Sequence, residues 1–333
     1  MKKTPFILLS IWVLISIISC DTTNKRNFSA EPIHIKRFDR DLFQLIITDT
    51  PELQEKIVAD YPAMLKVVGL GLFGVRDTQS PVFFDRLVNY YSEPTLYQLY
   101  RDALMKYDNI ETIETIETNL SVGFQYIKTC FPSMQIPAVF MHVSGLQQNM
   151  LVDDSLLSIS IDKYLGSEYP LYENYFYTYQ RRKMSPECIA PDCLKAWLIS
   201  EYPFIGNDRV LLERMIYEGK IKYIIHKALP KVLHEVLLGY SLSEYQWCKQ
   251  NEKILWNSII ERKHLYTPDA ATTAGYFSDR SSDFISDDAP GNLGSWVGMQ
   301  IVTKYMERTK DSIEDLMKHT DYQEILTKSK YKP

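Results

Sequence analysis

Two segments of the chain contain part of a known catalytic or cofactor-binding pattern. The first begins at His234 and Glu235, which match the start of the zinc-peptidase motif H-E-x-x-H. In that motif two histidines one helical turn apart hold the metal, and the glutamate activates water. Leu238 stands where the second histidine is needed, and a leucine side chain cannot ligate zinc. None of the six histidines has another four residues away, so we expect no helical two-histidine metal site.

The second segment is the glycine pattern at 69–74, which matches the dinucleotide-binding sequence G-x-G-x-x-G. That sequence binds a pyrophosphate only when a strand precedes it and its last glycine opens a helix. Here a predicted helix precedes the glycines, so we expect them to allow a tight turn instead. The chain has no nucleophile elbow and no P-loop, and we predict no catalytic residue and no cofactor.

A third segment, Tyr217-Glu218-Gly219-Lys220, places a glycine inside a predicted helix. Glycine inside a helix lowers the helix stability by about 1 kcal/mol relative to alanine, so we expect a compensating role. Close packing against a neighbouring element is the interpretation we favour, and a polar site around Glu218 is the alternative.

The N-terminus has the pattern of a lipoprotein signal. Lys2 and Lys3 form a positive region, and an apolar run at 6–18 follows and ends before Cys20. The run is shorter than the roughly 20 apolar residues that a membrane-spanning helix needs. We predict a signal peptide at 1–19, a lipidated Cys20 with a polar tether at 20–30, and one globular domain at 31–333.

Composition narrows the classes of partner. The formal net charge is −5 and becomes more negative once Lys2 and Lys3 are removed with the signal, and no basic stripe is present. Nucleic acid is therefore not an expected partner. In an oxidising compartment Cys188 and Cys193 could form a short-loop disulfide, but buried free thiols are the interpretation we favour, and no matching Cys or His pair indicates zinc.

The hydrophobic periodicity predicts an α+β fold that is predominantly helical, with a small antiparallel sheet. Ser241 and Glu244 form a capping box, and the isoleucines from 110 onward recur every three or four residues along one helix face. Predicted strands lie at 33–38, 136–143 and 156–161, the last two paired. Predicted helices lie at 51–67, 81–91, 92–107, 110–127, 186–202, 209–229, 241–262 and 293–308.

Together with the lipobox, the residues Ile17-Ile-Ser-Cys20 at the end of the signal, several motifs resemble the gliding motility lipoprotein GldB family. They lie at 35–43, 162–170, 215–220, 238–241, 247–256 and 290–306, and include Pro290-Gly-Asn-Leu-Gly-Ser-Trp-Val-Gly298. The resemblance implies a helix-rich α+β fold and a place in the gliding motility and associated protein secretion machinery. It also implies a cell-envelope protein of a Gram-negative bacterium, held by its lipid on the inner or outer membrane and facing the periplasm, with other envelope proteins as partners. It implies no established catalytic activity.

The family is also similar to zincin-type metallopeptidase domains, in which strands precede an H-E-x-x-H helix and a later Glu-Gly helix supplies the third ligand. Glu218-Gly219 would occupy the later place, but the earlier place, within 195–202, contains no histidine. The resemblance therefore implies a zincin-like domain that lacks the H-E-x-x-H site and holds no metal. Asp162, Glu218 and Lys220 lie in the matched motifs and are our candidate pocket residues.

Three functional classes stay open at this point. The leading one is a non-catalytic lipoprotein that offers a binding surface to a larger machine, with exposed Tyr and Trp as anchors if they cluster. The second is an envelope zinc peptidase or hydrolase with a non-standard metal site built from Glu218 with His226 or His142. The third is a periplasmic binding module for a sugar or peptide, which no motif supports.

Overall fold

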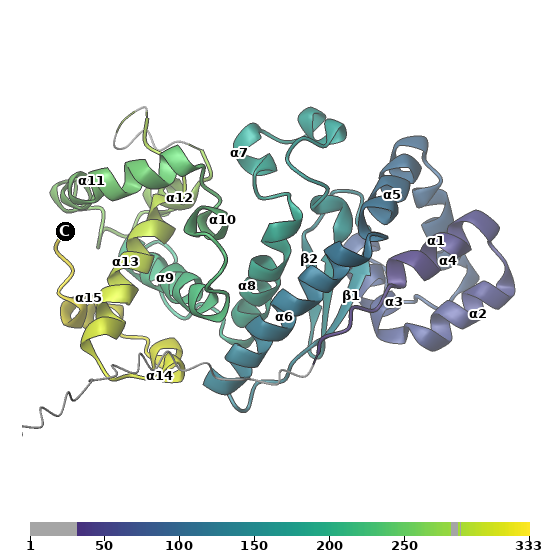
Figure 1. Ribbon diagram of the computed structural model, residues 1–333, viewed down its shortest axis with the longest axis horizontal. Coiled ribbons are helices and arrows are strands. Elements are labelled where there is room, and N and C mark those ends of the chain that lie inside the picture. Colours follow the sequence, from purple (N-terminus) through teal and green to yellow (C-terminus); the bar gives the residue numbers. More distant parts are fainter. Residues whose placement is uncertain (1–31, 281–285, 287) are drawn as a thin grey trace, which may run out of the picture.

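The structure is a computed structural model that describes residues 32–280, 286 and 288–333 (Figure 1). The predicted signal peptide, Cys20 and the tether at 20–30 lie outside the described residues. Within the described part, helices dominate and one small sheet lies near the middle of the molecule.

Residues 32–107 form five α-helices, and all but the first begin at a proline, because a proline at the first position loses no hydrogen bond and has helical φ already. They are α1 (Phe38–Thr48), α2 (Pro51–Asp60), α3 (Pro62–Val68), α4 (Pro81–Tyr91) and α5 (Pro94–Tyr107). The single helix predicted at 51–67 is wrong, since the chain breaks at Tyr61 ahead of Pro62. The cap of α5 is Glu93, whose carboxylate accepts from the Leu96 backbone N–H, and not Ser92.

The glycines at 69–74 do not form the tight turn that we predicted. Gly69–Phe73 continues α3 as a π-helical turn, and Gly74 ends it in the left-handed conformation with φ 64°. A Cβ on Gly69 would overlap the side chain of Thr78, so the following segment folds back closely over this glycine.

The long helix α6 (Ile110–Cys130) confirms the prediction from its isoleucine spacing. Asn109 caps it by accepting from the Thr112 backbone N–H. Its buried face carries side chains spaced three and four residues apart, namely Ile116, Leu120, Phe124 and Ile127.

The sheet is mixed, whereas we predicted an antiparallel one. Its strands are β1 (Ala138–His142), β2 (Met150–Asp153) and β3 (Leu156–Ser160), in the order β1-β3-β2. The predicted pairing of the runs at 136–143 and 156–161 is confirmed, and it is parallel. Strand β2, which we missed, pairs antiparallel with β3 through a hairpin. The predicted strand at 33–38 makes one bridge only, from Lys36 to Phe140.

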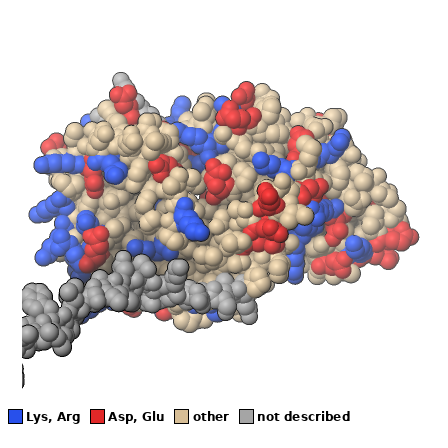
Figure 2. Space-filling view, viewed as in Figure 1, with Lys and Arg blue, Asp and Glu red and all other residues tan. Residues whose placement is uncertain are grey.

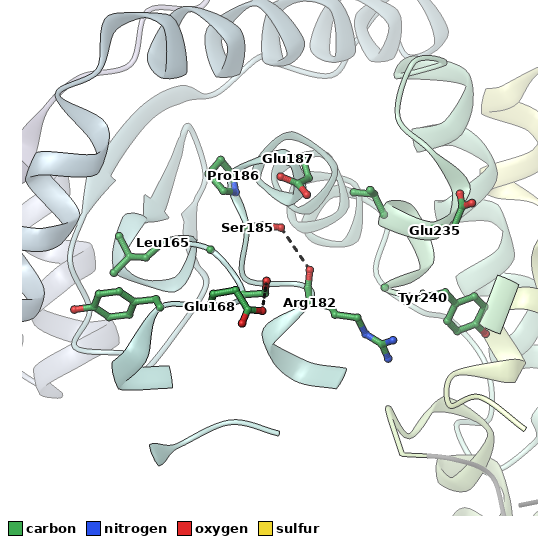
Figure 3. A pocket seen from close by; sticks show the side chains of 13 residues that line it. Leu165, Glu168, Arg182, Ser185, Pro186, Glu187, Glu235 and Tyr240 are labelled. Atoms are coloured by element: carbon green, nitrogen blue, oxygen red, sulfur yellow. Dashed lines mark hydrogen bonds between the residues drawn. The ribbon is translucent and has the colours of Figure 1, made fainter. Parts of the chain in front are cut away.

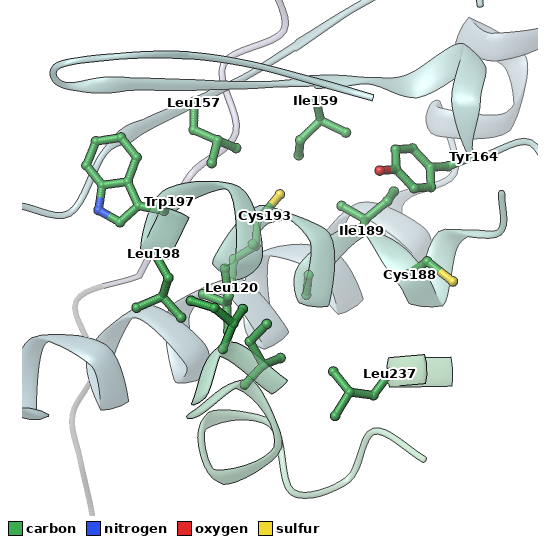
Figure 4. Packing of buried hydrophobic residues seen from close by; sticks show 14 of the residues in the cluster. Leu120, Leu157, Ile159, Tyr164, Cys188, Ile189, Cys193, Trp197, Leu198 and Leu237 are labelled. Carbon is green, nitrogen blue, oxygen red and sulfur yellow. The ribbon is translucent and has the colours of Figure 1, made fainter. Parts of the chain in front are cut away.

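Helices cover both faces of the sheet, which explains why every residue of β3 is buried. Helices α1 and α3 pack on one face, and α8 (Ile189–Glu201) packs on the other. Figure 4 shows Leu157 and Ile159 of β3 facing Trp197 and Ile189 of α8. Helix α6 then packs against the far side of α8, so α8 lies at the centre of the molecule.

Short elements connect α8 to the sheet. They are the 3₁₀ turns η2 (Ile161–Lys163), η3 (Pro170–Asn174) and η4 (Pro186–Cys188), and the one-turn helix α7 (Thr178–Arg181).

The C-terminal half is helical and is built around a close pair, α9 (Leu211–Ala228) and α13 (Leu293–Arg308). Gly219 meets Gly298 backbone to backbone, and a Cβ on either would overlap the other helix. The close-packing interpretation of Gly219 is therefore confirmed. Around the pair lie α10 (His234–Leu238), α11 (Leu242–Glu261), α12 (Ala270–Phe277), α14 (Ile313–Lys318) and α15 (Tyr322–Ser329), and Ser241 with Glu244 forms the predicted capping box of α11.

Candidate functional site: a central cleft and the charged helices behind it

Asp162 holds a loop in place and does not line the central cleft that is described below. Its carboxylate is fully buried just after β3, where it accepts hydrogen bonds from the backbone N–H groups of Ser144 (2.9 Å) and Leu146 (2.6 Å) and from the Ser160 hydroxyl (2.7 Å). The loop it holds passes through left-handed conformations at Gly145 and Leu146. A buried carboxylate with these partners stabilises the fold.

Glu218 lies on α9 and faces α8. One carboxylate oxygen is 3.6 Å from the Lys195 ammonium of α8, and the other is 3.4 Å from the guanidinium of Arg214, one helical turn earlier. The side chain is mostly buried, so its charge needs these partners. The side chain that α8 presents to Glu218 is thus a cation, and the carboxylate is already neutralised.

Two further charges extend this arrangement, and no motif in the sequence indicates them. Lys222, one turn beyond Glu218, is buried and donates to the Leu237 carbonyl of α10; burial lowers its pKa to about 7. Asp192 of α8 accepts from the Tyr164 hydroxyl at 2.9 Å, and burial raises the pKa of its carboxyl. We call Asp192, Lys195, Arg214, Glu218 and Lys222 the α8–α9 charge cluster.

Lys220 points to a different part of the molecule from Glu218, because residues two apart on a helix do not share a face. Its ammonium donates to the His319 carbonyl at 2.5 Å and lies 5.2 Å from the centre of the Tyr322 ring. Burial lowers its pKa to about 7. Asp162, Glu218 and Lys220 therefore have separate partners, and the structure does not bring them into one pocket.

A cleft of about 660 Å³ opens beside η4 and α10 (Figure 3). We call it the central cleft. Its walls come from three segments that are distant in sequence: 165–169, 182–187 and 235–240. A second hollow of about 630 Å³ shares Pro186, Glu187 and Val236 with it and continues toward α6.

Carboxylates outnumber free cations in the central cleft. Glu168, Glu187 and Glu235 line it, as labelled in Figure 3. The guanidinium of Arg182, which also lines it, is paired with Glu244 at 2.8 Å. Elsewhere on the face in view, Lys and Arg are interspersed with Asp and Glu (Figure 2). The cleft is therefore suited to a partner that carries positive charge.

The charge cluster supports one wall of the cleft. Lys222 donates to the carbonyl of Leu237, and Val236, just before it, and Gly239, two residues after it, line the cleft. Glu235 lies on the same short helix. The cluster thus fixes α10 against α9, and α10 positions part of the cleft surface.

His142 and His226, which could form a zinc site with Glu218, do not lie beside its carboxylate. His142 lies on β1 with its Nδ1 2.8 Å from the Ser158 hydroxyl, and burial lowers its pKa to about 3. His226 follows Glu218 by two helical turns, about 12 Å along α9. Across the described residues, no group of three or more His, Cys, Asp or Glu side chains could hold a metal ion.

Cys188, Cys193 and Cys248 are buried free thiols. Cys188 immediately precedes α8 and Cys193 lies inside it, with its sulfur 3.9 Å from that of Met150. The short-loop disulfide alternative is therefore wrong, because the helix carries the two sulfurs into different surroundings. Burial raises the pKa of Cys188 to about 11, so its thiol is unreactive at neutral pH.

Comparison with known proteins gives a family but no characterised relative. No curated protein and no solved structure matches the chain significantly. Among the described residues, no helix is long and apolar enough to cross a membrane. The family model described as gliding motility protein GldB matches residues 21–333, nearly the whole chain. The chain therefore belongs to the GldB family of gliding motility proteins.

Proposed function

We propose that this chain is a lipoprotein held on a membrane of the Gram-negative cell envelope through Cys20, with its globular domain facing the periplasm. In that position it contributes a binding surface, without catalysis, to the gliding motility and associated protein secretion apparatus. The lipobox supports the anchor, and the family match supports the motility role.

The observation that carries the non-catalytic part of the proposal is the pairing of Glu218 with Lys195 and Arg214. A catalytic carboxylate must be free to take a proton or to bind a metal. Here two cations compensate it, and the neighbouring Lys222 is held by a backbone carbonyl. The charges that could perform chemistry instead hold α8, α9 and α10 together.

The binding surface in this proposal is the central cleft. Glu168 and Glu187 are exposed, and Glu235 is half-buried. The walls of the cleft come from α10, from the segment after β3 and from the residues just before α8. An acidic cleft with rigid walls favours a basic segment of another envelope protein, because little ordering is required when the segment binds.

We also propose that the domain is related to zincin-type metallopeptidases without their metal site. The order of elements supports this idea: the three strands precede α8, and α9 carries Glu218-Gly219. In an active member of such a fold α8 would present histidines toward Glu218, whereas here it presents Lys195.

Lipidation can be tested by metabolic labelling with a palmitate analogue. The wild-type chain should carry the label and fractionate with membranes, and Cys20→Ala should lose the label. Cys130→Ala, which removes a different thiol, is the matched control and should keep it. Label that persists in Cys20→Ala would overturn the anchor.

Catalysis through a metal can be tested by elemental analysis of the purified full chain. We expect little metal, unchanged in Glu218→Gln and in the control Glu201→Gln, an exposed glutamate at the end of α8. Zinc near one ion per chain that is lost only in Glu218→Gln would favour the alternative, an envelope zinc peptidase or hydrolase.

A further inference from the structure

A smaller pocket of about 260 Å³ lies on the C-terminal half, where helix α10 lines both this pocket and the central cleft with different residues. It is bounded by the C-terminal turns of α9, the start of α10 and one face each of α11 and α13. It is smaller than the usual range for drug-sized ligands, about 300–1,000 Å³, so an occupant has the size of a single ring or less. We call it the histidine pocket, after His226 and His234, which both line it.

Three rings of this pocket pack in a row, which we call the imidazole stack. The centres of the His226 and His234 rings are 4.2 Å apart with their planes tilted by 38°, and the Tyr245 ring lies 5.6 Å from His234 at an angle of 23°. His226 and His234 thus pack against each other while both line the pocket. Ring edges carry the positive end of the aromatic quadrupole and, in histidine, the N–H donors.

Two buried nitrogens beside the stack have no hydrogen-bond partner within the described residues, Nδ1 of His226 and Nε1 of Trp296. The Trp296 side chain is only 3% exposed and lines the pocket. An indole N–H can only donate, and buried donors are normally paired. The indole N–H therefore calls for an acceptor, which a negatively charged or oxygen-rich ligand would supply, and Nδ1 of His226 calls for one as well when it carries a proton.

The charges around the pocket also favour a negatively charged ligand. Lys227 and Lys249 line it, with their ammonium groups over the rings of Tyr223 and Tyr245 at 5.3 and 5.8 Å. Glu252 is the carboxylate among the lining residues, and it accepts a hydrogen bond from the Tyr331 hydroxyl at 2.8 Å. Gln300 and Thr303 add neutral polar groups.

From this arrangement we infer that the histidine pocket binds a small ligand through an oxyanion, a carboxylate or a phosphate, on the edges of the imidazole stack and the two lysines. This site is separate from the surface of the proposed function, because it shares no lining residue with the central cleft. The ammonium and imidazolium groups would bind the oxyanion by charge-assisted hydrogen bonds.

Binding by this mechanism strengthens as the pH falls. Burial lowers the pKa of both imidazoles; His234 and Lys227 lower that of His226 further, and Lys249 lowers that of His234 while Glu235 raises it. From α11, the pocket lining adds Glu252, whose negative charge favours protonation of the imidazoles, and the neutral Tyr245. Among the lining residues from α11 and α13, Lys249 is the one whose charge opposes that protonation. A bound anion favours the protonated rings, so proton uptake accompanies binding.

The test is calorimetric titration of the full chain with inorganic phosphate and with glucuronate, and with glucose as the uncharged match of glucuronate. We expect phosphate, glucuronate or both to bind, more tightly at about pH 5.5 than at about pH 7.5. Binding of phosphate alone identifies a phosphate ligand, and binding of glucuronate alone identifies a carboxylate. Equal binding of glucose, or no binding of either anion at both pH values, would overturn the inference.

Variants separate the pocket from general attraction of anions to the surface. Lys249→Gln and His226→Gln should each weaken anion binding about tenfold, as expected for loss of a charge-assisted hydrogen bond. Lys253→Gln, which removes an exposed lysine one turn further along α11 and outside the pocket, should leave it unchanged. Equal weakening by Lys253→Gln and Lys249→Gln would contradict the proposed site, as would full binding by both His226→Gln and Lys249→Gln.

Discussion

Asp162 shows how a buried carboxylate can serve the backbone. Its oxygens accept from two N–H groups of the loop after β1, and those groups have no strand or helix partner. In Asp162→Ala the buried N–H of Ser144 and the part-buried N–H of Leu146 would lose their acceptor. We expect a loss of about 3 kcal/mol in the free energy of unfolding, measured with urea. The exposed Asp154→Ala, in the turn between β2 and β3, is the control and should change little; equal effects would contradict this role.

Lys222 predicts a pH dependence of stability. Its pKa is about 7 in the folded chain and near its ordinary value of 10.5 when unfolded, so between these values the unfolded state binds more protons. The lysine's contribution to stability therefore rises with pH from about 7 to about 10. Lys222→Met should show a weaker rise than wild type across that window in urea titrations, with the exposed Lys231→Met as control. Parallel curves for Lys222→Met and wild type would refute the depressed pKa.

For single residues, the sequence predicted those roles that depend on neighbours along the chain. The glycine after Glu218 indicates close helix packing, because glycine has no other benefit inside a helix. The contacts of Glu218 with Lys195, and of Lys222 with Leu237, depend on how α8, α9 and α10 meet in space. No spacing rule connects such positions, so the charge cluster could not be predicted.

Helices α9 and α13 are held at a distance that only glycine allows at their crossing. A Cβ on Gly298 would overlap the Met215 carbonyl, which belongs to the backbone of α9 and cannot move alone. We expect Gly298→Ala to destabilise the chain by about 3 kcal/mol, at the upper end for overpacking, in thermal or urea unfolding. Gly123→Ala in α6 is the matched control: its Cβ would meet the Leu194 side chain, which can turn away, so the loss should be smaller. Equal losses would contradict the close crossing.

Elements were predictable where a local signal is strong. The face of α6 follows from its spacing, and the capping box of α11 follows from Ser241 and Glu244. The four residues of β2 are too few to show alternation, and the parallel pairing of β1 with β3 is a tertiary property that strand patterns do not contain. The break at Tyr61 was signalled by Pro62, because the residue before proline avoids helical backbone.

The whole molecule joins an N-terminal half around the sheet to a C-terminal half around α9 and α13, with α8 between them (Figure 1). The central cleft is lined by segments on both sides of this junction, 165–169 and 182–187 from the first and 235–240 from the second. A basic partner bound there would contact both halves. Glu187→Gln together with Glu235→Gln should weaken capture of such a partner without lowering the unfolding temperature; unchanged capture would place the binding surface elsewhere.

The lipid-anchored role is tested most directly by the spreading of colonies that lack this chain and are complemented with variants of it. The wild-type chain should restore spreading, as should Cys130→Ala. Cys20→Ala should fail to restore it although the folded domain accumulates, because the domain is not held at the membrane. Full spreading with an unlipidated Cys20→Ala chain would contradict the claim that this GldB-family protein acts as a lipid-anchored component of the motility apparatus.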